Sequence, residues 1–439
     1  MIANNVHLYT WVDIQDVISL AQQQHDWPES LVWARTYWDG LALGIRPGTQ
    51  QEVLSWLADK FGSRFCGGQG PNKGANIAPH ILLESVSGKS RQLEVFLEET
   101  EETPRQSRYS PRLARPSVLW PPHETRGYPA PLPENLPPVV AFHSFNGEGE
   151  QTLLSIALAN ALLVKRPTSR VLLIDGDIEA PRLSWLLRLT NATGSLADFF
   201  SLVHSDPDET GTESIQLVAE RLKELLLDGV YVLPAFRLDK RFAPLDVKPW
   251  HFIQGVKDPF ALTTMLARLG QSLDVQAVIV DLRSGLSELS AWLLLDPRVY
   301  RVLVTSLSGP AIEGTRYLLE LLAEVAPVKH KHEPLPALMV TTKTTPAVET
   351  SSQDMHHAAG SRATNQSLEP LKSLLRKKVD GPTDLLVQKV EFDSKFTTLP
   401  NEWSEVTNLI SASNLIEQMQ PLVDWLPHPY QQGASQKGR

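Results

Sequence analysis

The sequence predicts an α/β protein in which a mainly parallel, doubly wound sheet follows a small N-terminal α+β domain. Two observations carry this prediction. After residue 137, short apolar runs rich in β-branched residues alternate with helical patterns, which is typical of a parallel sheet covered on both faces. Between residues 104 and 138, ten prolines exclude helices and central strands. The expected parts are therefore an N-terminal domain (1–100), a proline-rich linker (101–136), an α/β domain (137–430) and a disordered tail (431–439).

The N-terminal region shows three helical patterns followed by two strand-like runs. Asp13 is a candidate N-cap for the first helix, a second helical stretch covers residues 31–38, and a third follows Thr49. Strands are predicted over residues 81–86 and 93–97, on either side of a turn-prone sequence. No catalytic constellation occurs in this region, so we expect a small interaction domain.

The region after residue 137 contains the apolar runs expected of a buried sheet. Strands are predicted over residues 139–142, 171–174, 230–233, 277–280, 302–305 and 337–341. Helices are predicted over residues 152–165, 183–189, 213–227, 259–273, 312–325 and 405–425. Residues 345–385 include a polar stretch and predict a partly disordered insertion.

The composition argues against several classes of protein. The net charge of −9 disfavours a general nucleic-acid binder, because neutralising phosphates requires a basic surface. The only cysteine, Cys66, provides neither a disulfide framework nor a cysteine-based metal site. No apolar run approaches the ~20 residues that cross a bilayer, and the N-terminus lacks a secretory pattern. We therefore expect a soluble, cytoplasmic protein.

Polar residues follow three of the predicted strands. Residues 144–152 form a loop with two glycines between a strand and a helix, where backbone N–H groups can bind phosphate. Asp175 and Asp177 follow the next strand, a position suited to a Mg²⁺-bound or attacking water. Asp281 closes a later strand, as in the Walker B arrangement. Each feature alone fits a turn or a helix cap, but their order indicates a nucleotide site.

These features, in this order, resemble the ParA/MinD group of deviant Walker A ATPases, in the branch with a Lys-Gly-Gly-Val-Gly-Arg type of loop. The resemblance covers about residues 137–430 and rests on residues 171–181, 281–287 and 295–298. It implies a P-loop NTPase domain of the SIMIBI-like class.

The resemblance also implies roles for individual residues. Asp177 would position the attacking water and is the one catalytic candidate, while Thr152 and Asp281 would hold Mg²⁺ if a nucleotide binds. The residues implied to contact the nucleotide are Asn146, Gly147, Gly149, Gln151, Thr152, Asp175, Asp177, Asp281 and Arg283.

The loop departs from the family where its two lysines would stand. Asn146 occupies the position of the signature lysine and Gln151 that of the P-loop lysine, while Glu148 and Glu150 replace glycines. Unit charges ~4 Å apart interact by ~4 kcal/mol at a surface-like effective dielectric, so exchanging attraction for repulsion weakens triphosphate binding strongly. We therefore expect no turnover and no cofactor, with ATP and Mg²⁺ as the alternative. Arg182 is predicted to pair with Glu148 or Glu150 and fill the vacant site.

Three functions remain open at this point. The preferred one is a catalytically inactive ParA/MinD-like scaffold or regulatory subunit of a bacterial multi-protein system. The resemblance implies that this system is of a regulatory or antiviral defence type. The second is a nucleotide-switched ATPase that forms a homodimer and recruits a protein partner. The third is a nucleic-acid-associated subunit that binds through the linker arginines or through residues 372–378, although nucleic acid is not expected as the main ligand.

Two histidine motifs are more typical of ordinary loops than of metal sites. Residues 356–357 and residues 330–332 each lack a spaced third ligand. The arginines of the linker likewise favour solvated charge over a docking segment.

Overall fold

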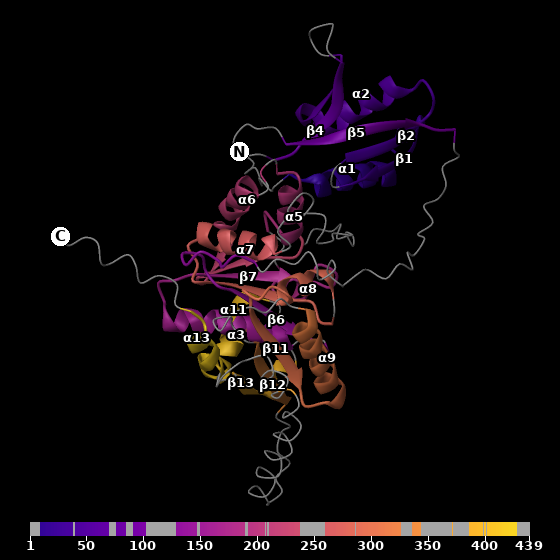
Figure 1. Ribbon diagram of the computed structural model, residues 1–439. Coiled ribbons are helices and arrows are strands. Elements are labelled where there is room, and N and C mark those ends of the chain that lie inside the picture. Colours follow the sequence, from indigo (N-terminus) through magenta and orange to yellow (C-terminus); the bar gives the residue numbers. More distant parts are fainter. Residues whose placement is uncertain are drawn as a thin grey trace, which may run out of the picture. The chain divides into compact units, whose positions relative to one another are not determined.

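The structure is a computed structural model, and it forms two compact units, each with its own sheet (Figure 1). It describes residues 9–37, 40–69, 76–84, 91–101, 129–146, 150–188, 192–206, 208, 210–237, 260–285, 287–325, 336–343, 371, 386–397, 399–400 and 402–427. Most of the predicted linker, the predicted insertion and the predicted tail lie outside these residues. No helix of the described part is long and apolar enough to cross a membrane.

The smaller unit contains a five-stranded sheet with the strand order β1-β2-β5-β4-β3, in which β2 and β5 are parallel and the other pairs are antiparallel. Its strands are β1 (Leu31–Thr36), β2 (Gly40–Ile45), β3 (Phe65–Gln69), β4 (Asn76–Leu82) and β5 (Gln92–Glu99). Its helices from the N-terminal part are α1 (Trp11–Gln23), α2 (Gln50–Phe61) and the short 3-10 helix η1 (Gly62–Arg64). The predicted small α+β domain is therefore present, with more strands than the sequence indicated.

Two predictions for this unit were wrong. Residues 31–38 do not form a helix, because Leu31–Thr36 pairs as a strand with β2, and an apolar run this short fits either structure. Asp13 is not the N-cap of α1. Thr10 is the cap, since its hydroxyl accepts from the N–H of Val12, while Asp13 stands at the third helical position and accepts from the N–H of Thr10 at 2.7 Å.

The smaller unit also includes two helices from later in the chain, α5 (Leu196–His204) and α6 (Thr212–Leu222). The buried guanidinium of Arg91 joins them to the N-terminal sheet. It donates to Oδ2 of Asp206 at 2.8 Å, to the hydroxyl of Ser214 at 2.9 Å and to the carbonyl of Leu202 at 2.8 Å. Nothing in the sequence indicated that these helices would pack with the N-terminal domain.

The larger unit contains an eight-stranded sheet with the order β13-β12-β11-β6-β10-β7-β9-β8, parallel except for the β8–β9 pair. Its strands are β6 (Val139–Ser144), β7 (Val171–Gly176), β8 (Leu226–Leu227), β9 (Val230–Leu233), β10 (Ala277–Leu282), β11 (Tyr300–Ser306), β12 (Ala337–Lys343) and β13 (Val387–Phe392). The predicted mainly parallel α/β fold is confirmed, and every predicted strand of this region is present.

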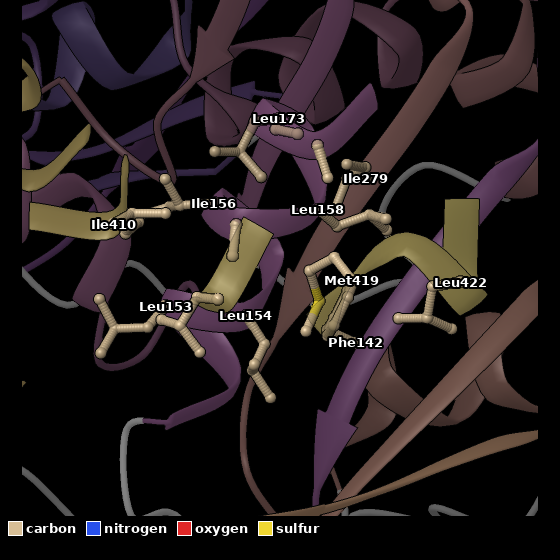
Figure 2. Close-up of a cluster of buried hydrophobic side chains, with 14 of the residues drawn as sticks. Phe142, Leu153, Leu154, Ile156, Leu158, Leu173, Ile279, Ile410, Met419 and Leu422 are labelled. Atoms are coloured by element: carbon tan, nitrogen blue, oxygen red, sulfur yellow. The ribbon is translucent and has the colours of Figure 1, made fainter. Parts of the chain in front are cut away.

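Helix α3 (Glu150–Lys165) lies at the centre of the larger unit. It packs on β6, β7 and β10 and also on the C-terminal helices, so that most of its side chains are buried. Figure 2 shows side chains from β6, α3 and the C-terminal helices in one apolar cluster, among them Phe142, Leu154 and Met419. The other helices of this unit are α4 (Arg182–Leu186), α7 (Ala261–Ser272), α8 (Glu288–Leu294), α9 (Gly309–Val325), α11 (Trp403–Ser411), α12 (Leu415–Gln418), α13 (Gln420–Trp425) and the 3-10 helix η4 (Ser394–Thr397).

Three predicted helices are shorter than expected. The helix predicted over residues 183–189 ends at Leu186, and Arg188 has a φ of 43°, outside the helical region. The helix predicted over residues 213–227 ends at Leu222, because Leu226–Leu227 pairs with β9 as a short strand. The helix predicted over residues 405–425 is divided into α11, α12 and α13. Pro421 stands in the first turn of α13. Its ring would clash inside a continuous helix but is tolerated where a helix begins.

Candidate functional site

Three neighbouring parallel strands end at one edge of the large sheet and bring the candidate segments together. Strand β10 lies between β6 and β7, and Asp281 on β10 is in register with Phe142 on β6 and with Asp175 on β7. Because the strands are parallel, the loops that follow them emerge at the same edge. The structure thus gathers the three polar segments that are far apart in the sequence.

Gln151 and Thr152, in the first turn of α3, both turn toward Asp281. The amide nitrogen of Gln151 donates to Oδ1 of Asp281 at 3.0 Å and also to the carbonyl of Leu282. The hydroxyl of Thr152 donates to Oδ2 of Asp281 at 2.6 Å. All three side chains are buried. The position at which the resemblance implies a lysine therefore holds an amide that is fixed on the Walker B-type aspartate.

Asp175 is fully buried at the end of β7. Its Oδ2 accepts from the N–H of Ser184 at 2.7 Å and from the Ser184 hydroxyl at 2.6 Å, and its Oδ1 accepts from the N–H of Asp177 at 3.1 Å. Burial, and next the charge of Asp281, raise the pKa of Asp175 to about 8, although these hydrogen bonds oppose the rise. Ser184 also accepts from the N–H of Ala235 at 2.9 Å. Asp175 and Ser184 together tie the ends of β7 and β9 to α4.

Asp281 and Asp177 also have raised pKa values. Burial raises the pKa of Asp281 to about 7, against the hydrogen bonds from Thr152 and Gln151. Burial likewise raises the pKa of Asp177, while the N–H of Ala180, which donates to its Oδ1 at 2.8 Å, opposes that rise. The carboxyl groups of Asp175 and Asp281 are therefore less charged at neutral pH than solvated ones, because burial disfavours their charged form.

Two candidate cations near the site, Arg283 and His143, are engaged or neutral. The guanidinium of Arg283 forms an ion pair with Glu179, with side-chain exposures of 38% and 54%. His143, on β6, is fully buried, and burial lowers its pKa to about 4, so its ring is neutral at physiological pH. Neither side chain offers a free positive charge to a phosphate in this arrangement.

Arg182, the first residue of α4, is an exposed residue whose charge reaches the site. Its positive charge opposes the rise in pKa of both Asp177 and Asp281. The predicted pairing of Arg182 with Glu148 or Glu150 stays a prediction, since Glu148 lies outside the described residues.

Ser144 fixes the start of the loop between β6 and α3, a role that the sequence did not indicate. Its carbonyl accepts from the N–H of Gly285 at 3.0 Å, and its hydroxyl lies 3.1 Å from the hydroxyl of Ser284. Gly285 adopts a φ of 76°, which favours glycine. The loops after β6 and β10 are therefore bonded to each other.

Phe145, the next residue, packs against α9. Its ring meets that of Tyr317 edge to face, with 6.3 Å between the centroids. A Cβ atom at Gly314 would lie 2.1 Å from Cδ1 of Phe145, so the ring occupies the space that a larger residue at that position would need. Gly314 was the only feature of the sequence that could have indicated this contact.

The observed donor set fits Mg²⁺ better than it fits a triphosphate. The Thr152 hydroxyl and the Asp281 carboxylate are hard oxygen donors 2.6 Å apart, the kind that Mg²⁺ prefers. A triphosphate needs positive charge beside it, and Gln151 is neutral and directed at Asp281. Among the described residues, no group of three or more His, Cys, Asp or Glu side chains is arranged to hold a metal ion.

Several predicted residues lie outside the described part of the chain. They are Gly147 and Gly149 of the loop, the histidine motifs at 330–332 and 356–357, and residues 372–378. Asn146 is described, and this partly exposed residue stands directly before the gap.

No family model and no curated protein matches this sequence. Solved structures do match. The chain is similar to a ParA family ATPase from Chlorobium tepidum TLS, with 15% identity, a TM-score of 0.43, and coverage of 66% of this chain and 98% of that one. The MinC:MinD cell division protein complex of Aquifex aeolicus matches with 14% identity, a TM-score of 0.42, and coverage of 65% and 96%. Apo McdA of Cyanthece matches with 13% identity, a TM-score of 0.43, and coverage of 66% and 98%. At these identities the likeness concerns fold alone.

Proposed function

We propose that this chain is a catalytically inactive ParA/MinD-like protein that acts as a scaffold or regulatory subunit for protein partners in the cytoplasm. The sheet, α3 and the bond between Thr152 and Asp281 fit the architecture of a nucleotide site, while Asn146 and Gln151 lack the positive charge that two lysines would bring to turnover. A bacterial multi-protein system of a regulatory or antiviral defence type is proposed from the sequence resemblance.

The observation that carries this proposal is the hydrogen bond from Gln151 to Asp281. A lysine ammonium ~4 Å from a phosphate contributes ~4 kcal/mol at a surface-like effective dielectric, which corresponds to about a thousandfold in affinity. The amide of Gln151 contributes none of this attraction.

Equilibrium binding of ATP and of ADP to the full chain, with and without Mg²⁺, tests the proposal. Calorimetric titration is expected to show no binding at millimolar nucleotide. Micromolar, Mg²⁺-dependent binding would overturn the inactive-site proposal.

A second candidate function is a nucleotide-switched ATPase that dimerises and recruits a partner. The observation that favours it is the intact pair of Thr152 and Asp281, together with the charge of Arg182 acting on Asp281. This function predicts that Asp281→Ala abolishes Mg²⁺-dependent ATP binding and that Arg182→Gln weakens it. The inactive scaffold predicts that neither substitution alters nucleotide binding, since there is none to lose.

A further inference from the structure

One face of the N-terminal sheet is open among the described residues. Along β5 the side chains alternate, with Leu93 and Val95 buried and with Glu94, Phe96 and Glu98 exposed. A strand with this alternation has one face on the core and one in solvent. Phe96 is 54% exposed, which is unusual for an aromatic side chain at the middle of a strand.

The register shows which residues of the neighbouring strands share this face. Phe96 is paired with Ala42 of β2, and Ala42 with Arg35 of β1. One row further along, Glu98 is paired with Gly44, and Gly44 with Trp33. The open face is defined by Trp33, Arg35, Glu94, Phe96 and Glu98, together with Tyr37 directly after β1, which is 44% exposed.

Two aromatic rings lie flat across β2 on this face. A Cβ atom at Gly44 would lie 2.2 Å from Cε2 of Trp33, and one at Gly40 would lie 2.7 Å from Cε2 of Phe96. The glycines therefore leave space that the rings fill. At ~3.3 Å per residue, these two positions on one strand are ~13 Å apart. The result is a pair of aromatic rings, Phe96 exposed and Trp33 partly exposed, with small residues between them.

The charges of the open face are separated between its strands. Glu94 and Glu98 flank Phe96 on β5, and neither forms an ion pair with a described residue. The guanidinium of Arg35, on the opposite side, lies 4.7 Å from the centre of the Trp33 ring. The positive charge of Arg35 is thus engaged with an aromatic ring, while two carboxylates remain available to a cationic ligand.

We propose that the open face binds a basic, proline-rich segment of a partner protein in the polyproline II conformation. Proline-rich peptides dock on exposed aromatic side chains because their conformation is pre-formed and their rings stack on aromatic faces. About four residues at ~3.1 Å each span the distance between the two rings. The carboxylates of Glu94 and Glu98 select arginine or lysine on the ligand, and they oppose single-stranded nucleic acid, which also stacks on aromatic rings.

Fluorescence anisotropy on the full chain tests this proposal, with a labelled 12-residue peptide of alternating proline and arginine as the probe. Phe96→Ala is expected to weaken binding by at least about tenfold, and Tyr37→Ala provides a second variant of an exposed ring. The double change Glu94→Gln with Glu98→Gln is expected to weaken binding and to flatten its salt dependence. Val164→Ala, an exposed apolar position of the larger unit, is the matched control and is expected to leave binding unchanged.

Four outcomes of the peptide titrations would overturn the proposal, and a fifth comes from a linker variant. They are absence of binding at millimolar peptide, equal binding by Phe96→Ala, equal binding of a peptide with glycine in place of proline, and tighter binding of oligothymidine than of the peptide. A further variant replaces Arg105, Arg108, Arg112 and Arg115 with glutamine. Tighter peptide binding by that variant would show that the chain's own linker occupies the face, and would overturn the assignment to a partner.

Discussion

The amide nitrogen of Gln151 donates a hydrogen bond to Oδ1 of Asp281 over 3.0 Å, at the position where the resembling ATPases have a lysine. Gln151→Lys would place an ammonium group beside Asp281 and beside any bound phosphate. We expect Gln151→Lys to bind ATP measurably at millimolar nucleotide in calorimetry with Mg²⁺, where the natural chain is expected to show no binding. Gln151→Met has a similar length and no charge, so it serves as the control. An equal effect of both substitutions would contradict the electrostatic explanation.

The raised pKa of Asp281 makes stability depend on pH. An aspartate carboxyl group in the unfolded chain has its ordinary pKa of 3.8, whereas burial raises the pKa of Asp281 in the folded protein to about 7. Between these values the folded state holds a proton that the unfolded state has lost, so each increase in pH favours unfolding. We therefore expect Asp281→Asn, which has no titrating group at this position, to lose less stability than the natural chain as pH rises. Its melting temperature, relative to the natural chain, should increase as pH rises from about 5 to about 8.

Asp274→Asn is the matched control for this measurement. Asp274 is exposed and has a φ of 54°, which asparagine also adopts readily. Thermal unfolding of the three proteins in matched buffers should therefore show a pH-dependent difference for Asp281→Asn alone. A constant difference across the pH range would contradict the assigned shift.

Because Phe145 packs against Gly314 of α9, replacing this glycine with alanine should destabilise the chain, which is the opposite of the usual effect of this change in a helix. Glycine to alanine inside a helix ordinarily stabilises by up to ~1 kcal/mol. At Gly314 the added methyl group would lie 2.1 Å from the Phe145 ring, so we expect Gly314→Ala to destabilise the chain by ~1–3 kcal/mol in chemical denaturation. Gly309→Ala, where a Cβ atom meets nothing within 4 Å, is the control and should not destabilise. Recovery in the double variant Phe145→Leu with Gly314→Ala would identify the ring as the cause.

The buried pair of Arg91 and Asp206 should be essential for the smaller unit. Both side chains are 1% exposed, so Arg91→Met would leave a buried carboxylate without its cation, at a cost of ~3–5 kcal/mol. Denaturant unfolding followed by tryptophan fluorescence would measure this loss. Lys60→Met removes a partly exposed ion pair with Asp26 in the same unit and should have a much smaller effect. Equal losses in the two variants would show that burial does not set the value of the Arg91 pair.

The elements of the larger unit were predictable because their signals are local. Runs such as Val171–Ile174 and Ala277–Val280 are continuous, apolar and rich in β-branched residues. This composition is typical of a strand that is buried on both faces. Residues 31–36 were misread because a short apolar run with one tryptophan fits a helix as well as a strand. The hairpin with β2 decided between them, and that strand, rich in glycine and leucine, had no strand signal of its own.

The sequence by itself determined the order of the strands and helices along the larger unit and which polar residues stand at the strand ends. Periodicity and composition express these properties among neighbouring residues. Only the tertiary structure decided that Gln151 faces Asp281, 130 positions away, and that Arg91 is buried against Asp206, 115 positions away. Such contacts depend on which strands become neighbours and on how side chains fill the space between them. No local pattern in the chain carries that information, because burial and packing arise only when distant segments meet.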